Sequence, residues 1–130
     1  MLELTLPAQC DVIYVPCLLA NPLTGEQCII DAILDTGSQH SAISQEVSDA
    51  LQLSRGTEIH VEGSAGIADG WESECIVAMS ENDKWCVQVD VLPLLPVHMV
   101  IGMDIISTGN LSLSYEKDNY VFRFEQLAVK

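Results

Sequence analysis

The sequence is poor in basic residues and has no long apolar run. Lysine and arginine together number 5 against 19 acidic residues, so the formal net charge is −14 at pH 7. A surface this acidic repels phosphate backbones and anionic lipids, so we expect neither nucleic acid nor a membrane as a partner. No stretch of 18 apolar residues predicts a transmembrane helix, and residues 1–9 lack the basic region of a signal peptide. We therefore expect a cytoplasmic protein.

The signatures of metal sites and of disulfide frameworks are also missing. The five cysteines are odd in number and widely spaced, and neither a Cys-x-x-Cys nor a His-Glu-x-x-His motif occurs. We expect no metal, no cofactor and mostly buried thiols in a reducing compartment. The three histidines, His40, His60 and His98, fall in different predicted elements, and we interpret them as structural or exposed.

The length and composition predict one folded domain over residues 1–130. Hydrophobic residues make up 48% of the chain and charged residues 18%, which is typical of a folded protein. Alternating and β-branched patterns predict mostly strands. We expect strands at residues 10–19, 27–34, 41–43, 57–62, 71–79, 85–92, 100–101, 111–115 and 120–125, with a mobile glycine-rich connection at 63–70.

Two short helices are expected between these strands. Ser44 is a suitable cap for a helix over residues 45–53, with Val47, Ala50 and Leu51 on its buried face. A second helix over residues 104–108 would end at Gly109, because glycine commonly terminates helices. The chain therefore reads as mainly β, with one or two short helices.

One hexapeptide carries most of the functional information: Ile33-Leu34-Asp35-Thr36-Gly37-Ser38. Two apolar residues end a strand, and Asp-Thr-Gly then forms a tight turn. A carboxylate held on a strand-end turn is well placed for proton transfer. A second element, Val100-Ile101-Gly102, follows 65 residues after Gly37 and leads into the second predicted helix.

This pair of elements resembles the retropepsin-like aspartic proteases, the single-domain relatives of pepsin that include the retroviral enzymes. The local matches are residues 30–44 and 97–113, and the order of elements fits over roughly residues 4–125. The run Gly102-Met103-Asp104 is similar to that of cellular members. The resemblance implies a closed acid-protease β-barrel and an aspartic endopeptidase, a hydrolase of peptide bonds.

Peptide hydrolysis by carboxylates needs two of them, and this chain has one Asp-Thr-Gly. The resemblance therefore implies a homodimer in which Asp35 of each copy meets at a two-fold axis. Asp35 is the expected catalytic residue. Thr36 would bond across the axis, Gly37 would give the backbone room beside the carboxylate, and Ser38 would bond the outer oxygen of Asp35.

The glycine-rich segment lies where the family places the flap that closes over a bound peptide. The expected substrate-binding residues are Gly63, Ser64, Ala65, Gly66 and Ile67. Trp71, near the base of this segment, is expected either to line a pocket or to belong to the core.

The sequence departs from the retroviral pattern at two paired positions. Retroviral enzymes carry an ion pair between an Asp and an Arg where this chain has Gln39 and Met103. Asp104 is the nearest charge to that region, and capping of the short helix is an alternative role for it. Either residues 2–6 or residues 120–126 could supply a sheet between protomers.

Two other readings of the chain stay open. A non-catalytic retropepsin-like module for peptide binding or dimerisation would carry the same motif. A β-rich structural domain with a coincidental Asp-Thr-Gly would hold Asp35 away from any symmetry axis.

Overall fold

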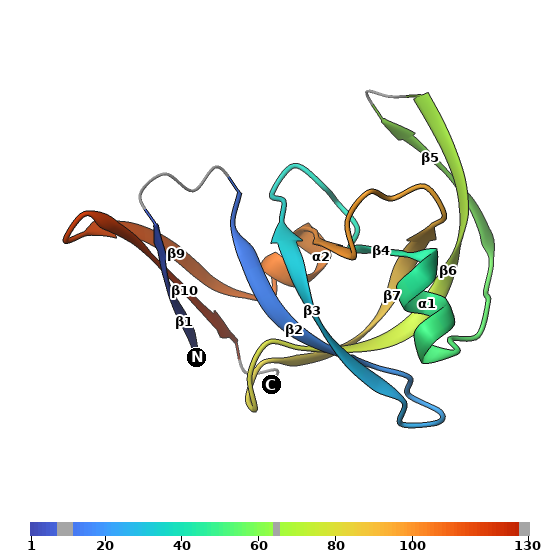
Figure 1. The fold of residues 1–130 in the computed structure, drawn as a ribbon, viewed down its shortest axis with the longest axis horizontal. Coiled ribbons are helices and arrows are strands. Elements are labelled where there is room, and N and C mark those ends of the chain that lie inside the picture. Colours follow the sequence, from blue (N-terminus) through green and yellow to red (C-terminus); the bar gives the residue numbers. More distant parts are fainter. Residues whose placement is uncertain (8–11, 64–65, 128–130) are drawn as a thin grey trace.

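The structure is a computed structural model, and it describes residues 1–7, 12–63 and 66–127. Within these ranges the chain forms strands joined by short turns, with two short helices (Figure 1). The elements are β1 Leu2–Pro7, β2 Tyr14–Ala20, β3 Gln27–Leu34, β4 Ala42–Ser44, α1 Gln45–Leu51, β5 Glu58–Gly63, β6 Gly66–Ala78, β7 Lys84–Leu92, β8 Met99–Ile101, α2 Met103–Ile106, β9 Gly109–Glu116 and β10 Asn119–Gln126.

Most strands belong to one sheet that closes into a barrel. Its order is β2-β3-β8-β4-β7-β6-β5, and β2 also pairs with β6, so the first six strands of this order form a closed ring. β5 pairs only with β6 and forms with it a hairpin that extends beyond the barrel, here called the lid hairpin (Figure 1). This architecture confirms the expected mainly β barrel with two short helices.

A second sheet of three antiparallel strands has the order β1-β10-β9. β1 lies at one edge, as Pro7 required, because proline cannot donate to a neighbouring strand. Phe122 and Phe124 of the central strand β10 are fully buried and join the core that the barrel strands build. The two sheets therefore share one hydrophobic core.

The prediction that most cysteines are buried holds for two of the four described cysteines. Cys17 and Cys75 lie in the core, and burial raises the pKa of Cys17 to about 12 and that of Cys75 to about 11. Cys28 is half-buried, whereas Cys86 is exposed. These four thiols are free, and Cys10 lies outside the described residues. Thiols this hard to ionise make poor nucleophiles.

Helix α1 begins as expected and ends earlier. Val47 N donates to the hydroxyl of Ser44 at 3.3 Å, which confirms the predicted cap. Gln52 then adopts a left-handed conformation with φ of 54° and stops the helix after Leu51. The expected burial of Ala50 is wrong, because Ser48 occupies the inward face of this shorter helix and Ala50 is exposed.

Two glycine-containing segments were misjudged. Residues 66–70 were expected to be a loop, yet they begin strand β6 and pair with β5. Gly109 was expected to end a helix, yet it begins β9, and α2 ends at Ile106. In both places the cross-strand pairing outweighs the weak local preference of glycine for turns. Within the described residues no helix is long and apolar enough to cross a membrane.

Candidate active site

The Asp35 turn follows strand β3 and is attached to strand β8. β3 runs parallel to β8, with Leu34 opposite Ile101. Asp35 continues this register, and its backbone N–H donates to the carbonyl of Ile101 at 2.9 Å. The two sequence elements, 65 residues apart in the chain, thus lie side by side.

The chain leaving Asp35 crosses over the end of β8 before returning as β4 on its other side. Gly102 lies directly under this crossing. A Cβ atom added there would come within 2.7 Å of the His40 carbonyl carbon and 2.9 Å of the Ser38 carbonyl oxygen. Only glycine fits this close backbone approach, which is the physical reason for the third residue of the Val100-Ile101-Gly102 element.

The Asp35 carboxylate is exposed and fixed from one side. Gly37 N donates to Asp35 Oδ1 at 2.8 Å, and Ser38 N donates to the Asp35 carbonyl at 3.2 Å. A Cβ atom at Gly37 would lie 3.2 Å from the same carboxylate oxygen. Within the described part of the chain, Oδ2 has no hydrogen-bond partner, so one oxygen is available to a water or to a second acid.

The Ser38 hydroxyl does not make the expected hydrogen bond to Asp35. Its hydroxyl donates to the carbonyl of His40 at 2.8 Å instead of to the outer oxygen of Asp35. A hydroxyl has one hydrogen, so this bond is made in place of the expected one. Ser38 thereby stabilises the crossing segment, while Thr36 is exposed on the turn.

Asp104 holds the far end of the crossing segment, a role that the sequence reasoning missed. Its Oδ2 accepts from Ser41 N at 2.9 Å and its Oδ1 accepts from the Ser41 hydroxyl at 2.7 Å. Ser41 is fully buried, and its hydroxyl also accepts from Gly102 N at 3.0 Å. Asp104 Oδ1 also accepts from Ile105 N within the first turn of α2, whose N-cap residue is Gly102 and not Asp104.

The segment Ser38–Gln39 is joined to the start of helix α2 through backbone hydrogen bonds. Met103 N donates to the Ser38 carbonyl at 2.7 Å, and Asp104 N donates to the Gln39 carbonyl at 3.1 Å. These two N–H groups begin helix α2, where intrahelical partners are missing. The crossing segment therefore caps the helix with its carbonyls, and these bonds connect the two elements.

A further carboxylate lies beside this network on β7. Asp90 N donates to the Ser41 carbonyl at 3.0 Å. Burial raises the pKa of the Asp90 carboxyl above its ordinary value; His40 opposes this shift, while Glu72 and Asp104 reinforce it. The region between the turn and the lid hairpin is therefore acidic.

The lid hairpin has the form of a long antiparallel pair. Val61 lies opposite Ala68, and Gly63 lies opposite Gly66 at the described end of the hairpin. Ile67 belongs to β6, whereas the expected lid residues Ser64 and Ala65 lie outside the described residues. On the exposed face, His60 Nδ1 lies 2.5 Å from Asp69 Oδ1 across the two strands.

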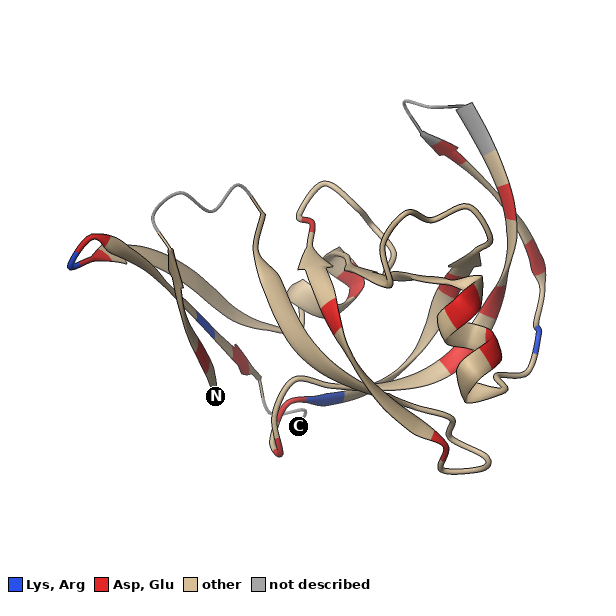
Figure 2. Cartoon of the chain, viewed as in Figure 1, with Lys and Arg blue, Asp and Glu red and all other residues tan. Residues whose placement is uncertain are grey.

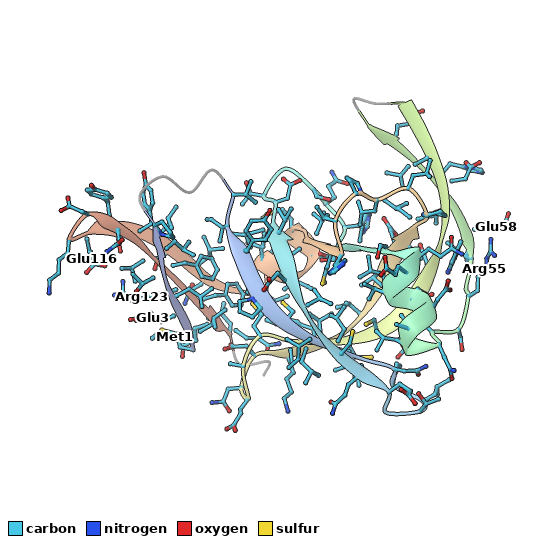
Figure 3. The ribbon with its side chains drawn as sticks, in the orientation of Figure 1. Met1, Glu3, Arg55, Glu58, Glu116 and Arg123 are labelled. Atoms are coloured by element: carbon cyan, nitrogen blue, oxygen red, sulfur yellow. The ribbon has the colours of Figure 1, made fainter. Side chains whose placement is uncertain are left out.

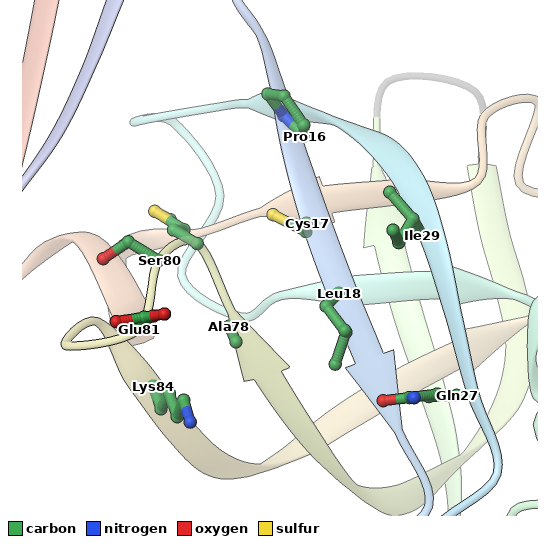
Figure 4. A pocket seen from close by; sticks show the side chains of 10 residues that line it. Pro16, Cys17, Leu18, Gln27, Ile29, Ala78, Ser80, Glu81 and Lys84 are labelled. Atoms are coloured by element: carbon green, nitrogen blue, oxygen red, sulfur yellow. The ribbon is translucent and has the colours of Figure 1, made fainter.

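Two cavities lie away from Asp35. The larger, of about 460 Å³, lies at the opposite end of β3 from Asp35, between Leu18, Ile29 and Ala78 (Figure 4). The smaller, of about 250 Å³, lies at the base of the lid hairpin, where the Arg55 guanidinium stacks 3.8 Å from the centre of the Trp71 ring. Trp71 is 6% exposed, so it both belongs to the core and lines this cavity.

The described residues hold no group of three or more His, Cys, Asp or Glu side chains arranged to bind a metal ion. What the turn presents is a single exposed carboxylate with a free oxygen. A lone carboxylate can accept a proton from water, but peptide hydrolysis by this route also needs an acid to donate one.

Comparison with known proteins identifies the fold. No family model and no curated protein matches the sequence. Among solved structures, the EIAV protease in complex with an inhibitor aligns with a TM-score of 0.61 at 17% identity, over 76% of this chain and 88% of that one. A retropepsin-like aspartic protease from Rickettsia conorii aligns with a TM-score of 0.64 at 15% identity, over 93% of this chain and 98% of that one.

The retroviral protease-like domain of Ddi1 from Leishmania major aligns with a TM-score of 0.55 at 15% identity, over 88% of this chain and 96% of that one. At these identities the likeness establishes the fold and not the activity. The chain has the retropepsin-like fold, which confirms the resemblance first seen at Asp35 and Gly102.

Proposed function

We propose that the protein is an aspartic endopeptidase that works as a homodimer, with one Asp35 from each copy. The observation that carries this proposal is the state of the Asp35 carboxylate. It is exposed at the end of β3, its Oδ1 is held by Gly37 N, and its Oδ2 is free among the described residues. The retropepsin-like fold supports the proposal, because two of the structures that share it are described as proteases.

The chemistry follows from two carboxyl groups sharing one proton. Two carboxylates about 3 Å apart cannot both ionise, so the dyad holds one proton at moderate pH. The ionised Asp35 accepts a proton from water as the water oxygen bonds to the scissile carbonyl carbon. The protonated Asp35 donates to the carbonyl oxygen, and proton transfer to the amide nitrogen then releases the amine. Carboxylates alone activate the water, so the proposal needs no cofactor.

The neighbouring residues take supporting roles in this proposal. Thr36 bonds across the axis, Gly37 holds the catalytic oxygen, and Ser38 stabilises the crossing segment through the His40 carbonyl. The element Val100-Ile101-Gly102 is the rigid base on which the turn rests. The lid segment, Gly63 and Ser64 to Ile67, closes over a bound peptide and excludes water.

The substitution Asp35→Asn tests the proposal, and Asp31→Asn, an exposed carboxylate on the same strand, is the matched control. We expect Asp35→Asn to abolish cleavage of a peptide library read by mass spectrometry while leaving circular dichroism and dimer mass unchanged. Asp31→Asn should cleave as the wild type does. Retained cleavage by the purified Asp35→Asn protein would refute the enzyme assignment.

One observation favours a second candidate, a non-catalytic peptide-binding or dimerisation module. The Ser38 hydroxyl, the side-chain donor expected at the outer oxygen of Asp35, is turned to His40 instead. Such a module would bind library peptides without cleaving them, and its peptide affinity would be unchanged by Asp35→Asn. Cleavage that depends on Asp35 excludes it.

A further inference from the structure

We propose that the outer face of the barrel carries a second binding site, separate from Asp35, for a small carboxylate with an apolar chain. The site is the larger cavity, at the opposite end of β3 from Asp35, with Lys84 at its edge (Figure 4). Its volume of about 460 Å³ is typical of cavities that bind small molecules. The inference does not depend on the proposed function, because it involves neither Asp35 nor a second copy of the chain.

The cavity lies over one row of side chains that crosses four neighbouring strands, here called the outer row. Lys84 of β7 lies opposite Ala78 of β6, and Ala78 lies opposite Leu18 of β2. Leu18 in turn lies opposite Ile29 of β3, and all four residues line the cavity. Residues that alternate with them, such as Leu19, face the core, so the outer row lies on the outside of the barrel.

The outer row is apolar, and it is hollowed at Ala78. Ile29 is 74% exposed and Leu18 is half-buried, while the methyl group of Ala78 is covered from both sides at 9% exposure. A short side chain between longer ones leaves a depression in the surface. Single exposed apolar residues are ordinary on a protein surface, but apolar residues that line a concave surface are typical of small-molecule sites.

The backbone beside the cavity does not favour an added β-strand. β2 pairs with β6 only over Leu18–Ala20, so its earlier residues have no strand neighbour on that side. Ile13 bonds to β3 through its carbonyl, and the alternation of bonds along an antiparallel strand turns the backbone of Pro16 away from β3. Pro16 lacks the N–H that an added strand would need there. A small molecule therefore fits this edge better than a strand of a partner protein.

Lys84 supplies a positive charge at one end of the outer row. The start of β7 is one of the few basic segments of the ribbon (Figure 2). Arg123 donates to Glu3 at 2.9 Å and to Glu116 at 3.3 Å (Figure 3), and Arg55 stacks over an aromatic ring. The Lys84 ammonium, by contrast, forms no ion pair with any described residue.

A carboxylate at the end of an alkyl chain matches this combination of charge and apolar surface. The carboxylate pairs with Lys84, and the chain lies over Ala78 and Leu18 and covers apolar surface as far as Ile29. Three steps between strands make the outer row roughly 14 Å long, enough for an extended alkyl chain. The net charge of −14 repels anions elsewhere, so the local cation selects this position.

The rim of the cavity also carries one acid, Glu81, on the turn outside the outer row. Glu81 would attract an alkyl ammonium, which is the alternative ligand that an experiment has to separate from a carboxylate. Lys84 is the better placed of the two charges, because strand pairing fixes it in line with the apolar residues.

Titration of the full chain with octanoate, followed by amide NMR shifts, tests the site, with octylammonium as the probe of opposite charge. We expect saturable shifts along the outer row with octanoate and weaker binding of octylammonium. Lys84→Met keeps the apolar stem and removes the charge, and it should raise the octanoate dissociation constant about fivefold, the size of one partly exposed ion pair. The matched control, Lys117→Met in the turn between β9 and β10, should leave it unchanged.

Ala78→Leu is a second variant, because it fills the depression while Lys84 stays in place. It should weaken octanoate binding at least as strongly as Lys84→Met does, and Ile29→Gln replaces it if circular dichroism shows that it does not fold. Equal dissociation constants for Lys84→Met and Lys117→Met would overturn the proposal. So would tighter binding of octylammonium, or no saturable shift at millimolar octanoate. Cleavage plays no part in these measurements, so their failure leaves the enzyme assignment intact.

Discussion

At the scale of single residues, three residues hold the segment that crosses from Asp35 to strand β4 in the candidate site. Gly102 leaves room for the crossing, Ser41 fills the buried space beside it, and Asp104 accepts both polar hydrogens of Ser41. None of the three touches the free oxygen of Asp35. They fix the backbone that follows Asp35. In the proposed dimer, this fixed backbone would determine how accurately the Asp35 turns of the two copies are positioned.

Asp104→Asn should therefore weaken both the fold and the site. An amide replaces one acceptor oxygen with a donor that faces Ser41 N–H or the Ser41 hydroxyl, so one charge-assisted bond is lost. We expect a loss of about 2 kcal/mol in unfolding free energy, measured by urea titration. Asp49→Asn on the exposed face of α1 is the control and should lie within about 0.5 kcal/mol of the wild type. Equal stability of the two variants would show that the Ser41 bonds contribute little.

The sequence predicts Asp35 as the candidate catalytic residue, but it does not predict that Ser41 and Asp104 hold the chain segment that follows it. The Asp-Thr-Gly turn consists of consecutive residues, so the sequence motif alone predicts the exposed carboxylate. The bond between Ser41 and Asp104 joins residues 63 positions apart, and neither residue is unusual in its own segment. The direction of the Ser38 hydroxyl was mispredicted for a similar reason, since its acceptor became available only when the chain crossed Gly102.

At the scale of elements, the predictions succeeded where side-chain pattern and turn chemistry agreed. Strand β3, over Gln27–Leu34, has the predicted bounds because a clear turn precedes it and the Asp35 turn follows it. The start of β6 was missed because its glycines favour a loop by composition. Gly70 is instead required within the strand, since a Cβ atom there would lie 2.1 Å from the Val91 carbonyl oxygen.

The turn between β6 and β7 is fastened to β10 by a buried carboxylate. Asp83 is 1% exposed and accepts from the Ser80 hydroxyl at 2.5 Å and from Gln126 N at 2.7 Å. Burial alone would raise the pKa of Asp83, but these hydrogen bonds and the amino group of Met1 outweigh it and lower the pKa. The contact connects the barrel to the three-stranded sheet that carries β9.

Asp83→Asn should loosen this connection in a pH-dependent way. Because the folded pKa of Asp83 is lowered, its stabilisation is present above the unfolded pKa of about 3.9 and is lost as pH falls through the folded value. We expect a loss of about 2 kcal/mol at pH 7 that shrinks steadily as the pH is lowered from 5 towards 2. Thermal unfolding across this range measures it. A difference between variant and wild type that is constant with pH would contradict the proposed ionised state.

At the scale of the whole molecule, the proposed site is incomplete in one chain, because the proposed chemistry needs a second carboxylate beside Asp35. The cavities of the single chain lie away from Asp35, at the far end of β3 and at the base of the lid hairpin. The proposed dimer would have to form between two strongly acidic molecules.

Added salt and lower pH should both strengthen the proposed dimer, because each reduces the repulsion between two acidic protomers. Each copy carries −14 at pH 7 and the sequence pI is about 4.1, so protomers repel each other least near acidic pH. The screening length falls from about 10 Å at 0.1 M salt to about 3 Å at 1 M. We expect the dimer dissociation constant at pH 7 to fall about tenfold over this range, which corresponds to about 1.4 kcal/mol of relieved repulsion. Sedimentation in sodium chloride measures it, with pH 5 as the control where the salt effect is smaller.

Cleavage should follow the same dependence when the enzyme is diluted below its dissociation constant. The rate should then be highest below neutral pH, where repulsion is weaker and the dyad keeps its shared proton more easily. A dissociation constant that rises with salt would indicate an interface built on ion pairs and would contradict the charge argument. A cleavage rate that climbs steadily from pH 5 to pH 8 would contradict both the charge argument and the shared proton, since each predicts the opposite slope.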